Sequence, residues 1–161
     1  MKIRPAHPTD RARVLELVPR LRAFGTVPLR SAQDLDDGET RTLNRYFETP
    51  SAPAATRLWV AESAAGLVEG VVYAERMTDY FTQEHHAHLG ILMVSEAAEG
   101  TGVARRLVET VEDWARSSGF RFLSLNVFAG NDRARSFYER RSFRVDTLRY
   151  VKTLDIAGGG N

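Results

Sequence analysis

Apolar residues recur along the chain at two different spacings, and the change from one spacing to the other separates helices from strands. The first helix is predicted by apolar residues three or four positions apart: Val14, Leu17, Val18, Leu21 and Phe24. Pro19 interrupts this series and should kink or split the helix. A short strand over Lys2–Arg4 precedes the helix, and Asp10 is placed to cap its first turn.

The middle of the chain changes to β-rich runs. After a Pro-Ser-Ala-Pro loop, the runs Leu58–Glu62 and Leu67–Glu75 are separated by the turn residues Ala65 and Gly66. This arrangement predicts a hairpin, and His86–Val94 predicts a third strand. The preceding segment, residues 25–53, gives a weaker signal, with a short helix expected around Leu43–Phe47. An acidic patch also lies there and consists of Asp34, Asp36, Asp37 and Glu39.

The last part of the chain alternates helices with strands. A helix that ends at Gly119 is expected to turn one apolar face inward: Ala104, Leu107, Val108, Val111 and Ala115. A strand over Phe120–Phe128 should follow it. Asn131 is then placed to cap a helix that carries Ala134, Phe137 and Tyr138. Two further strands, Phe143–Val145 and Leu148–Leu154, are expected to complete the sheet.

Composition narrows the functional classes. The 161 residues correspond to one domain, since domains usually contain roughly 100–200 residues. The 22 basic and 21 acidic side chains nearly balance, so binding to a nucleic-acid backbone is not expected. The chain has no cysteine, which excludes disulfides, thiolate zinc sites and a cysteine nucleophile. No apolar run reaches the roughly 18 residues that a membrane span requires, and Met1–Asp10 has no signal-peptide pattern, so we expect a cytoplasmic protein without a membrane partner.

The segment between the third strand and the next helix could bind an anion. Gly100 and Gly102 allow a close backbone approach just where the first N–H groups of a helix lack internal partners. Arg105 and Arg106 lie in the first turn of that helix, where a cation is unfavourable unless an anion binds. A plain glycine turn with solvated arginines is the alternative. Neither a dinucleotide fingerprint nor a Walker loop is present, because Arg105 stands at the third glycine position and no Gly-Lys-Ser/Thr follows.

The turn resembles that of the GCN5-related N-acetyltransferase (GNAT) family, whose pattern is Gln/Arg-x-x-Gly-x-Gly/Ala. The residues that carry the resemblance are Glu99, Gly100, Thr101, Gly102, Val103 and Ala104. A second family motif resembles Asn131-x-x-Ala134-x-x-Phe137-Tyr138, followed by Phe143. The chain departs from the family where Glu99 replaces Gln or Arg, where Glu96 replaces a frequent proline, and where Ser142 replaces the usual glycine. The acidic side chain of Glu99 must turn away from a pyrophosphate, but the backbone N–H groups of the turn can still donate hydrogen bonds to it.

The resemblance implies a fold and a cosubstrate. The fold class is α/β (mixed α+β): a central twisted mixed sheet of six to seven strands flanked by helices, with two parallel strands splayed at the cofactor site. One domain would span residues 1–156, with a disordered tail over 157–161. The cosubstrate would be acetyl coenzyme A, and no metal is expected. The implied cofactor-binding residues are Leu92, Met93, Val94, Glu99, Gly100, Thr101, Gly102, Val103, Ala104, Arg105, Asn131, Ala134, Phe137 and Tyr138. A backbone N–H of Leu92, Met93 or Val94 would polarise the thioester carbonyl.

The resemblance also implies catalytic roles. Tyr138 matches the tyrosine that protonates the departing thiolate, although a core tyrosine is the alternative. The base is less defined: His88 is the first candidate and His86 the second, since imidazole can accept a proton near neutral pH. Glu75 or Glu84 acting through water are further alternatives, as are solvated strand-end histidines. The three histidines His85, His86 and His88 lack a carboxylate at ligand spacing, which argues against a metal site.

The function implied is transfer of the acetyl group of acetyl coenzyme A directly to a primary amine of a small molecule or peptide N-terminus, through a ternary complex. A non-catalytic acyl-coenzyme-A-binding or sensing module is the alternative, and a nucleotide-binding oxidoreductase a weaker one. α-Amines should be easier acceptors than lysine-like amines, because deprotonation at pH 7 costs about 1 kcal/mol rather than about 4.6 kcal/mol. The acidic patch is a candidate acceptor region or a solvated loop, and a homodimer is left open.

Overall fold

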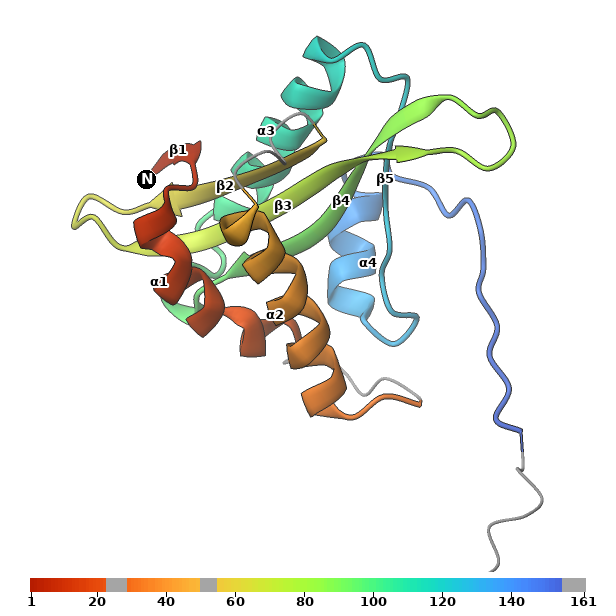
Figure 1. The fold of residues 1–161 in the computed structure, drawn as a ribbon, viewed down its shortest axis with the longest axis horizontal. Coiled ribbons are helices and arrows are strands. Elements are labelled where there is room, and N and C mark those ends of the chain that lie inside the picture. Colours follow the sequence, from red (N-terminus) through yellow and green to blue (C-terminus); the bar gives the residue numbers. More distant parts are fainter. Residues whose placement is uncertain (23–28, 50–54, 155–161) are drawn as a thin grey trace, which may run out of the picture.

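The computed structural model describes residues 1–22, 29–49 and 55–154. Five strands form one sheet in the order β1-β2-β3-β4-β5 (Figure 1). The strands are β1 (Lys2–Pro5), β2 (Thr56–Glu62), β3 (Val68–Thr78), β4 (His85–Val94) and β5 (Leu123–Leu125). The α-helices are α1 (Arg11–Glu16), α2 (Ala32–Glu48), α3 (Val103–Ser117) and α4 (Asp132–Glu139). Short 3-10 turns are η1 (Pro8–Asp10), η2 (Val18–Arg22) and η4 (Glu96–Ala98).

The sheet is antiparallel except at its last pair. β1 to β4 pair antiparallel with their neighbours, whereas β5 runs parallel to β4. The hairpin predicted from the two β-rich runs is confirmed as β2 and β3, and the third predicted strand is β4. The β3–β4 register shifts because Tyr73 pairs with Ile91 while Ala74 pairs with Leu89, which leaves Gly90 as an extra residue in β4. A bulge at Gly90 therefore changes which face the following side chains of β4 occupy.

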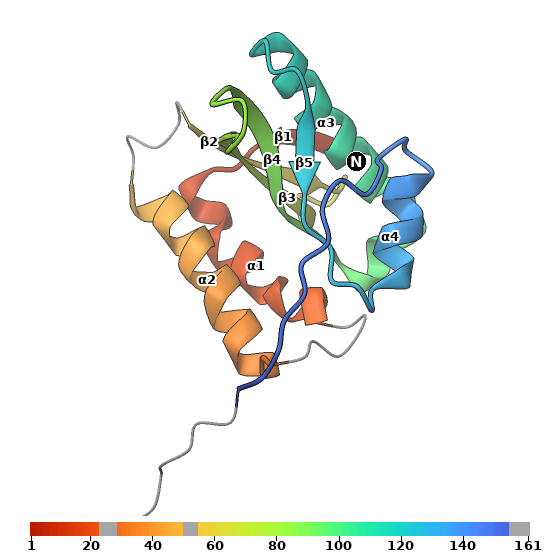
Figure 2. The same ribbon diagram turned by 90° about the vertical axis from the view of Figure 1, so that its right-hand side faces the viewer.

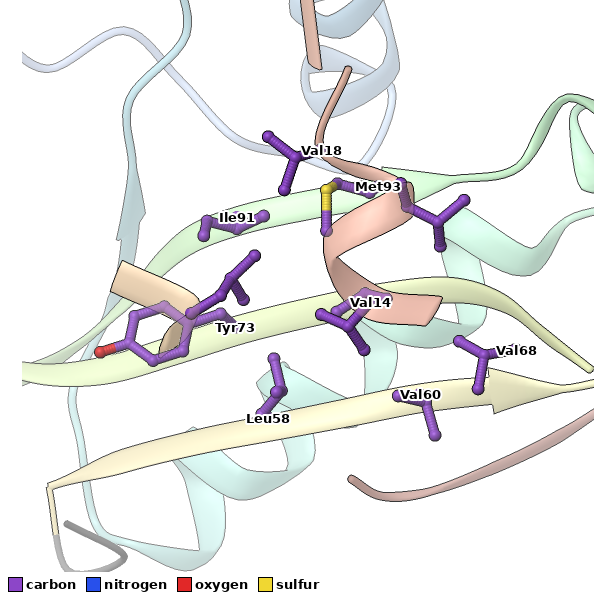
Figure 3. Packing of buried hydrophobic residues seen from close by; sticks show 11 residues of the cluster. Val14, Val18, Leu58, Val60, Val68, Tyr73, Ile91 and Met93 are labelled. Carbon is purple, nitrogen blue, oxygen red and sulfur yellow. The ribbon is translucent and has the colours of Figure 1, made fainter. Parts of the chain in front are cut away.

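Helices cover both faces of the sheet (Figures 1 and 2). On one face, α1, η2 and α2 pack on side chains of β2, β3 and β4; Figure 3 shows Val14 and Val18 lying over Leu58, Tyr73 and Met93. On the other face, α3 and α4 pack on the opposite side chains of the same strands. The buried residues of this second core are Ala61, Val72, Ala74, Leu89, Ala98, Val103, Leu107, Val108, Val111 and Tyr138. The inward face predicted for α3 is thus confirmed at Leu107, Val108, Val111 and Ala115.

The first helix is split where Pro19 predicts, since α1 ends at Glu16 and η2 begins at Val18. Asp10 is the N-cap residue of α1, as predicted, but its side chain makes no capping hydrogen bond to that helix. Its carboxylate instead accepts two hydrogen bonds from the Arg4 guanidinium, at 2.7 and 3.0 Å, and one from the His7 N–H at 2.7 Å. Asp10 therefore ties β1 to the start of the helical segment. The predicted position of Phe24 lies outside the described residues, as does the Pro-Ser-Ala-Pro loop.

The weakly patterned segment contains a helix much longer than predicted. α2 runs from Ala32 to Glu48, whereas the sequence predicted only Leu43–Phe47. Its start is fixed by a capping box, in which the Ser31 side chain accepts from the Asp34 N–H while the Asp34 carboxylate accepts from the Ser31 N–H. Leu43 is the fully buried residue of its inner face. α2 thereby forms the outer wall of the first core.

The C-terminal end of the sheet differs most from the expectation. The strand predicted over Phe120–Phe128 pairs only at Leu123–Leu125. The predicted strands Phe143–Val145 and Leu148–Leu154 are not formed, so the described part of the chain has five strands and not six or seven. Residues 144–154, here called the C-terminal arm, run away from the body (Figures 1 and 2). A strand exists only where a neighbour supplies hydrogen bonds, and no strand among the described residues pairs with the arm. The tail predicted over 157–161 lies outside the described residues.

Candidate active site

Strand β5 pairs with only part of the length of β4. β5 pairs with β4 at Ala87, His88 and Leu89, and its pairing stops at the Gly90 bulge. Beyond that point Leu92, Met93 and Val94 are paired with β3 alone among the described strands. Leu92 and Val94 point into the α3 core and Met93 into the α1 core. The predicted splay is therefore present, and it exposes an open backbone edge of β4.

The glycine turn follows this edge directly. Gly100 and Gly102 have positive φ values of 71° and 84°, a conformation that glycine adopts without strain. A Cβ added at either residue would meet no atom within 4 Å, so the turn faces open space. Gly102 is the N-cap of α3, and the first hydrogen bond of the helix joins the Arg106 N–H to the Gly102 carbonyl. The N–H groups of residues 103–105 thus have no acceptor within the helix, which fits an anion-binding turn.

Glu99, the residue that departs from the family pattern, is held by two arginines from distant segments. Its carboxylate pairs with Arg20 of η2 and, at 3.0 Å, with Arg133 of α4. The hydrogen bonds from Arg133 and from Arg20 hold the pKa of Glu99 below its usual range. The carboxylate is therefore ionised and neutralised within the protein. This pairing brings the first turn of α4 to the glycine turn.

The two arginines predicted beside the turn point elsewhere. Arg105 is exposed and lies 3.9 Å from Glu109 on the same helix. Arg106 donates a hydrogen bond of 2.7 Å to the Met1 carbonyl. A cavity of about 200 Å³ lies next to the turn and is lined in part by Ala98, Thr101 and Arg106. This volume is below the range of about 300–1,000 Å³ usual for ligand pockets, so this cavity alone is too small for a long cofactor.

The second motif forms α4 and packs against the same region. Asn131 accepts a hydrogen bond of 3.0 Å from the Ala134 N–H, which confirms its capping role. Ala134, Phe137 and Tyr138 all belong to the α3-side core, together with Leu92 and Val94 of the open edge. Ser142, which stands where the family usually has glycine, has a φ of 67°. Glycine adopts such a left-handed backbone without strain, which explains why the family pattern has glycine at this position.

Tyr138 is largely buried between aromatic rings. It is 8% exposed, and its ring lies edge-on to Phe137 at 5.1 Å and to Phe143 at 5.5 Å. Burial raises the pKa of Tyr138 above its ordinary value. The phenol therefore keeps its proton at neutral pH and remains a hydrogen-bond donor. This position shows the packing of a core tyrosine, and the catalytic role of Tyr138 stays a prediction.

The candidate histidines lie on the opposite face of the sheet from Tyr138. Leu123 and Leu125 pack in the same core as Tyr138, so Ser124 between them faces the other way. His88 Nδ1 lies 2.8 Å from Ser124 Oγ and shares that face. Ser124 Oγ can in turn donate to the Ala87 carbonyl at 3.5 Å. If it does, Nδ1 of His88 carries the proton and Nε2 keeps a free lone pair.

The surroundings of His88 favour its neutral form. Burial lowers the pKa of His88, with Glu75 opposing this effect and His86 adding to it. Glu75 is the residue paired with His88 across β3 and β4, and it accepts a hydrogen bond of 3.4 Å from the Tyr73 hydroxyl. The lowered pKa keeps the His88 imidazole neutral at neutral pH, so one of its two ring nitrogens carries a free lone pair.

The other candidate bases, His86 and Glu84, make contacts different from those of His88. His86 is 7% exposed and stacks on Phe122 at 4.5 Å, and its Nδ1 is buried with no hydrogen-bond partner among the described residues. Glu84 pairs with Arg121 at 2.9 Å on the surface. Within the described ranges, no group of three or more His, Cys, Asp or Glu side chains is arranged to hold a metal ion.

The acidic patch is spread over α2 and does not form one cluster. Asp34 caps the helix, Asp36 pairs with Arg22 at 3.0 Å, and Asp37 accepts from Gln33 at 2.7 Å. Glu39 differs because it is half-buried and burial raises its pKa. It lies one helical turn before the buried Leu43, and so on the inner side of α2. The sequence did not separate Glu39 from its exposed neighbours.

Comparison with known proteins assigns the family. The family model described as "Acetyltransferase (GNAT) family" matches residues 26–143. The chain belongs to the GNAT family. An N-acetyltransferase of Bacillus subtilis (strain 168), described as uncharacterized and named YycN, is 43% identical over 115 residues, which are 71% of this chain and 70% of that protein. This GNAT protein is accordingly an acetyl-coenzyme-A-dependent N-acetyltransferase, as its two motifs predicted.

Solved structures share the fold of this acetyltransferase at low sequence identity. The aminoglycoside 6'-N-acetyltransferase AAC(6')-IG of Acinetobacter haemolyticus has a TM-score of 0.70 at 16% identity, over 96% of this chain and 100% of that one. A ribosomal-protein-alanine N-acetyltransferase of Brucella melitensis biovar Abortus 2308 has a TM-score of 0.67 at 19% identity, over 96% and 100%. These two proteins are named for different acceptors, so the shared fold leaves the acceptor open. Among the described helices, none has the length and apolar character to cross a membrane.

Proposed function

We propose that this protein transfers the acetyl group of acetyl coenzyme A directly to a primary amine of a small molecule or peptide N-terminus, in a ternary complex. The observation that carries the proposal is the β4–β5 splay, with the glycine turn at its end, His88 on one face of the sheet and Tyr138 on the other. A direct transfer agrees with the absence of cysteine, because no cysteinyl intermediate can form.

The chain supplies two kinds of contact for the cofactor. The turn from Glu99 to Arg105 offers backbone N–H groups for the phosphates, and the open edge at Leu92, Met93 and Val94 offers strand-like hydrogen bonds for the pantetheine arm. Asn131, Ala134 and Phe137 of α4 are assigned to the cofactor as well, since Ala134 and Phe137 pack in the same core as Leu92 and Val94 of this edge. Acetyl coenzyme A supplies the acetyl group in activated form, as a thioester. The open space around Gly100 and Gly102 fits this assignment.

His88 serves as the base and Tyr138 as the hydrogen-bond donor. Nε2 of His88 accepts the proton of the acceptor amine, while Nδ1–H is oriented by Ser124. Tyr138 donates its hydroxyl hydrogen toward the sulfur position from the other face. Full proton transfer from the phenol to a thiolate would be uphill by about 2 kcal/mol at ordinary pKa values, and burial of Tyr138 raises that cost. A strong hydrogen bond is therefore its contribution.

The acceptor should be an α-amine rather than a lysine-like amine. A neutral imidazole with a lowered pKa is a weak base, so it favours amines that lose a proton easily. At pH 7 this loss costs about 1 kcal/mol for an α-amine and about 4.6 kcal/mol for a lysine side chain.

The amine preference can be tested with a panel of acceptors. We expect higher kcat/KM at pH 7 for peptide N-termini and amino-acid α-amines than for lysine side chains, polyamines or aminoglycosides, and a smaller gap at pH 9. Release of free coenzyme A thiol measures each reaction. Faster turnover of a polyamine or aminoglycoside at pH 7 would contradict the preference. Binding of acetyl coenzyme A without thiol release for any amine would assign a non-catalytic acyl-coenzyme-A-binding module instead.

Replacing His88 by Gln should flatten the acidic limb of the pH profile of kcat/KM. Because the pKa of His88 is lowered, this limb should lie below the ordinary imidazole value of about 6.5 in the wild type. His86→Gln is the matched control and should leave a limb in place. An unchanged limb in both single variants and in the double variant would exclude both histidines and move the role to Glu75 or to water.

A further inference from the structure

A row of three polar side chains crosses one face of the sheet next to the splay. Glu75 of β3 pairs with His88 of β4, and His88 pairs with Ser124 of β5. Residues paired across neighbouring strands point to the same face, so the three side chains lie side by side. β5 stays paired with β4 for one residue beyond this row, at Leu89. The row therefore borders the place where the two strands separate.

Tyr73 lies beside this row, two residues before Glu75 in β3 and on the same face. Its ring packs in the core under α1 and α2, edge-on to Tyr46 at 6.3 Å. Figure 3 shows its hydroxyl pointing away from Val68, and this hydroxyl donates a hydrogen bond of 3.4 Å to the Glu75 carboxylate. Glu75 therefore has an aromatic side chain next to it along β3 and the candidate base His88 next to it across the sheet.

The charge of the half-buried Glu75 is not neutralised by a neighbouring cation. In the described part of the chain, no basic side chain forms an ion pair with it. Burial and then the charge of Glu75 raise the pKa of Tyr73 to about 12, while Arg45 of α2 acts on that phenol in the opposite direction. Burial lowers the pKa of His88, and the charge of Glu75 opposes this effect. The negative charge of Glu75 thus acts directly on the surroundings of the candidate base.

We propose that Glu75 selects acceptors whose amine-bearing carbon carries no carboxylate, so that a peptide N-terminus or an amino-acid amide is acetylated in preference to the free amino acid. This inference rests on the proposed function, in which the acceptor amine reaches Nε2 of His88. Cβ atoms of directly paired residues are about 4.5–5.5 Å apart, so a group attached to the amine-bearing carbon comes close to Glu75. A second carboxylate there is repelled, whereas the ammonium form of an arriving acceptor is attracted.

Matched pairs of acceptors test the selection, each pair being an amino acid and its own amide, such as alanine and alaninamide. Thiol release at pH 7 gives the ratio of kcat/KM for the amide to kcat/KM for the free amino acid. The wild type should favour the amide, and Glu75→Gln should lower the ratio by about 10-fold, because the repulsion is lost. The free amino acid also has the more basic amine, but this difference is the same for both enzymes and cancels when their ratios are compared.

Two further variants control for charge and for position. Glu75→Asp keeps the negative charge and should keep most of the ratio. Glu112→Gln removes a carboxylate from α3, on the other face of the sheet, where Glu112 pairs with Arg116 at 2.9 Å, and should leave the ratio unchanged. Glutamine has the size of glutamate and can accept the same hydrogen bond from Tyr73, so Glu75→Gln should fold, which a melting curve checks.

The outcomes separate this inference from the proposed function. An unchanged ratio in Glu75→Gln overturns the inference, and so does a wild type that prefers free amino acids. An equal loss of kcat/KM for both members of each pair also overturns it, because that result would assign Glu75 to proton transfer and not to selection. Thiol release that is absent with every amine, including peptide N-termini, overturns the proposed function and this inference together.

Discussion

The Tyr138→Phe variant is expected to keep its affinity for acetyl coenzyme A and to turn over about 10- to 1,000-fold more slowly. The substitution removes only a hydroxyl, so the ring contacts with Phe137 and Phe143 persist. Burial is the cause that raises the pKa of Tyr138, and the phenol is thus protonated at every working pH. The lost hydrogen bond should lower kcat without adding a new pH limb.

The two candidate roles of Tyr138 give different results in this experiment. Cofactor affinity is measured by titration of the free enzyme, kcat by thiol release, and the free energy of unfolding by denaturant. Comparable loss of binding and turnover would assign the Tyr138 hydroxyl to the core or the cofactor pocket, while a donor to sulfur would lower turnover alone. Unchanged turnover would remove Tyr138 from the mechanism.

The elements with a clear local pattern of apolar residues and with turn or cap residues at their ends were predicted from the sequence. The β2–β3 hairpin, β4, α3 and α4 have alternating or helical apolar patterns, with turn or cap residues at their ends. The patterns suffice because α3 and α4 each bury one apolar face, while β2, β3 and β4 are β-rich runs bounded by turn residues. The capping contact of Asn131 is local as well, since its partner is Ala134.

Elements that depend on a distant partner were not predicted. α2 was missed over most of its length because its early turns are polar, although Ser31 and Asp34 form a capping box that could have marked its start. The arm has a strand pattern, yet none of the strands that the structure describes pairs with it. An alternating pattern indicates a strand only when an edge is available to pair with it.

In the candidate site as well, local motifs were predicted from the sequence, but contacts between distant segments were not. The glycine turn and the helix capped by Asn131 were predicted from motifs, because each motif lies within its own strand-turn-helix unit. The partners of Glu99 could not be found in this way, since Arg20 and Arg133 approach it from η2 and α4. Alternation correctly places His86 and His88 on one side of β4. Only the structure distinguishes the two histidines, because His86 stacks on Phe122 whereas His88 contacts Ser124.

The Gly102→Asp variant is expected to lose the thermal stabilisation that acetyl coenzyme A gives the wild type. A ligand at one hundred times its dissociation constant stabilises the folded state by about 2.7 kcal/mol. Gly102 is the N-cap of α3 with a φ of 84°, and the space beside it is open. A carboxylate there would fill that space with negative charge next to the N–H groups that should bind phosphate. Melting curves with and without saturating cofactor measure the change.

Gly102→Asn is the control that separates charge from shape. Asparagine and aspartate have nearly the same size and both tolerate a left-handed backbone better than most residues, so the two variants should melt at similar temperatures without cofactor. The Asn variant should retain part of the cofactor-induced shift, whereas the Asp variant should retain none. Equal loss in both would mean that a side chain of any charge blocks the turn. A wild type that saturating acetyl coenzyme A does not stabilise would contradict the assignment of Gly100 and Gly102 to the phosphates, because ligand that binds only the folded state must raise its stability.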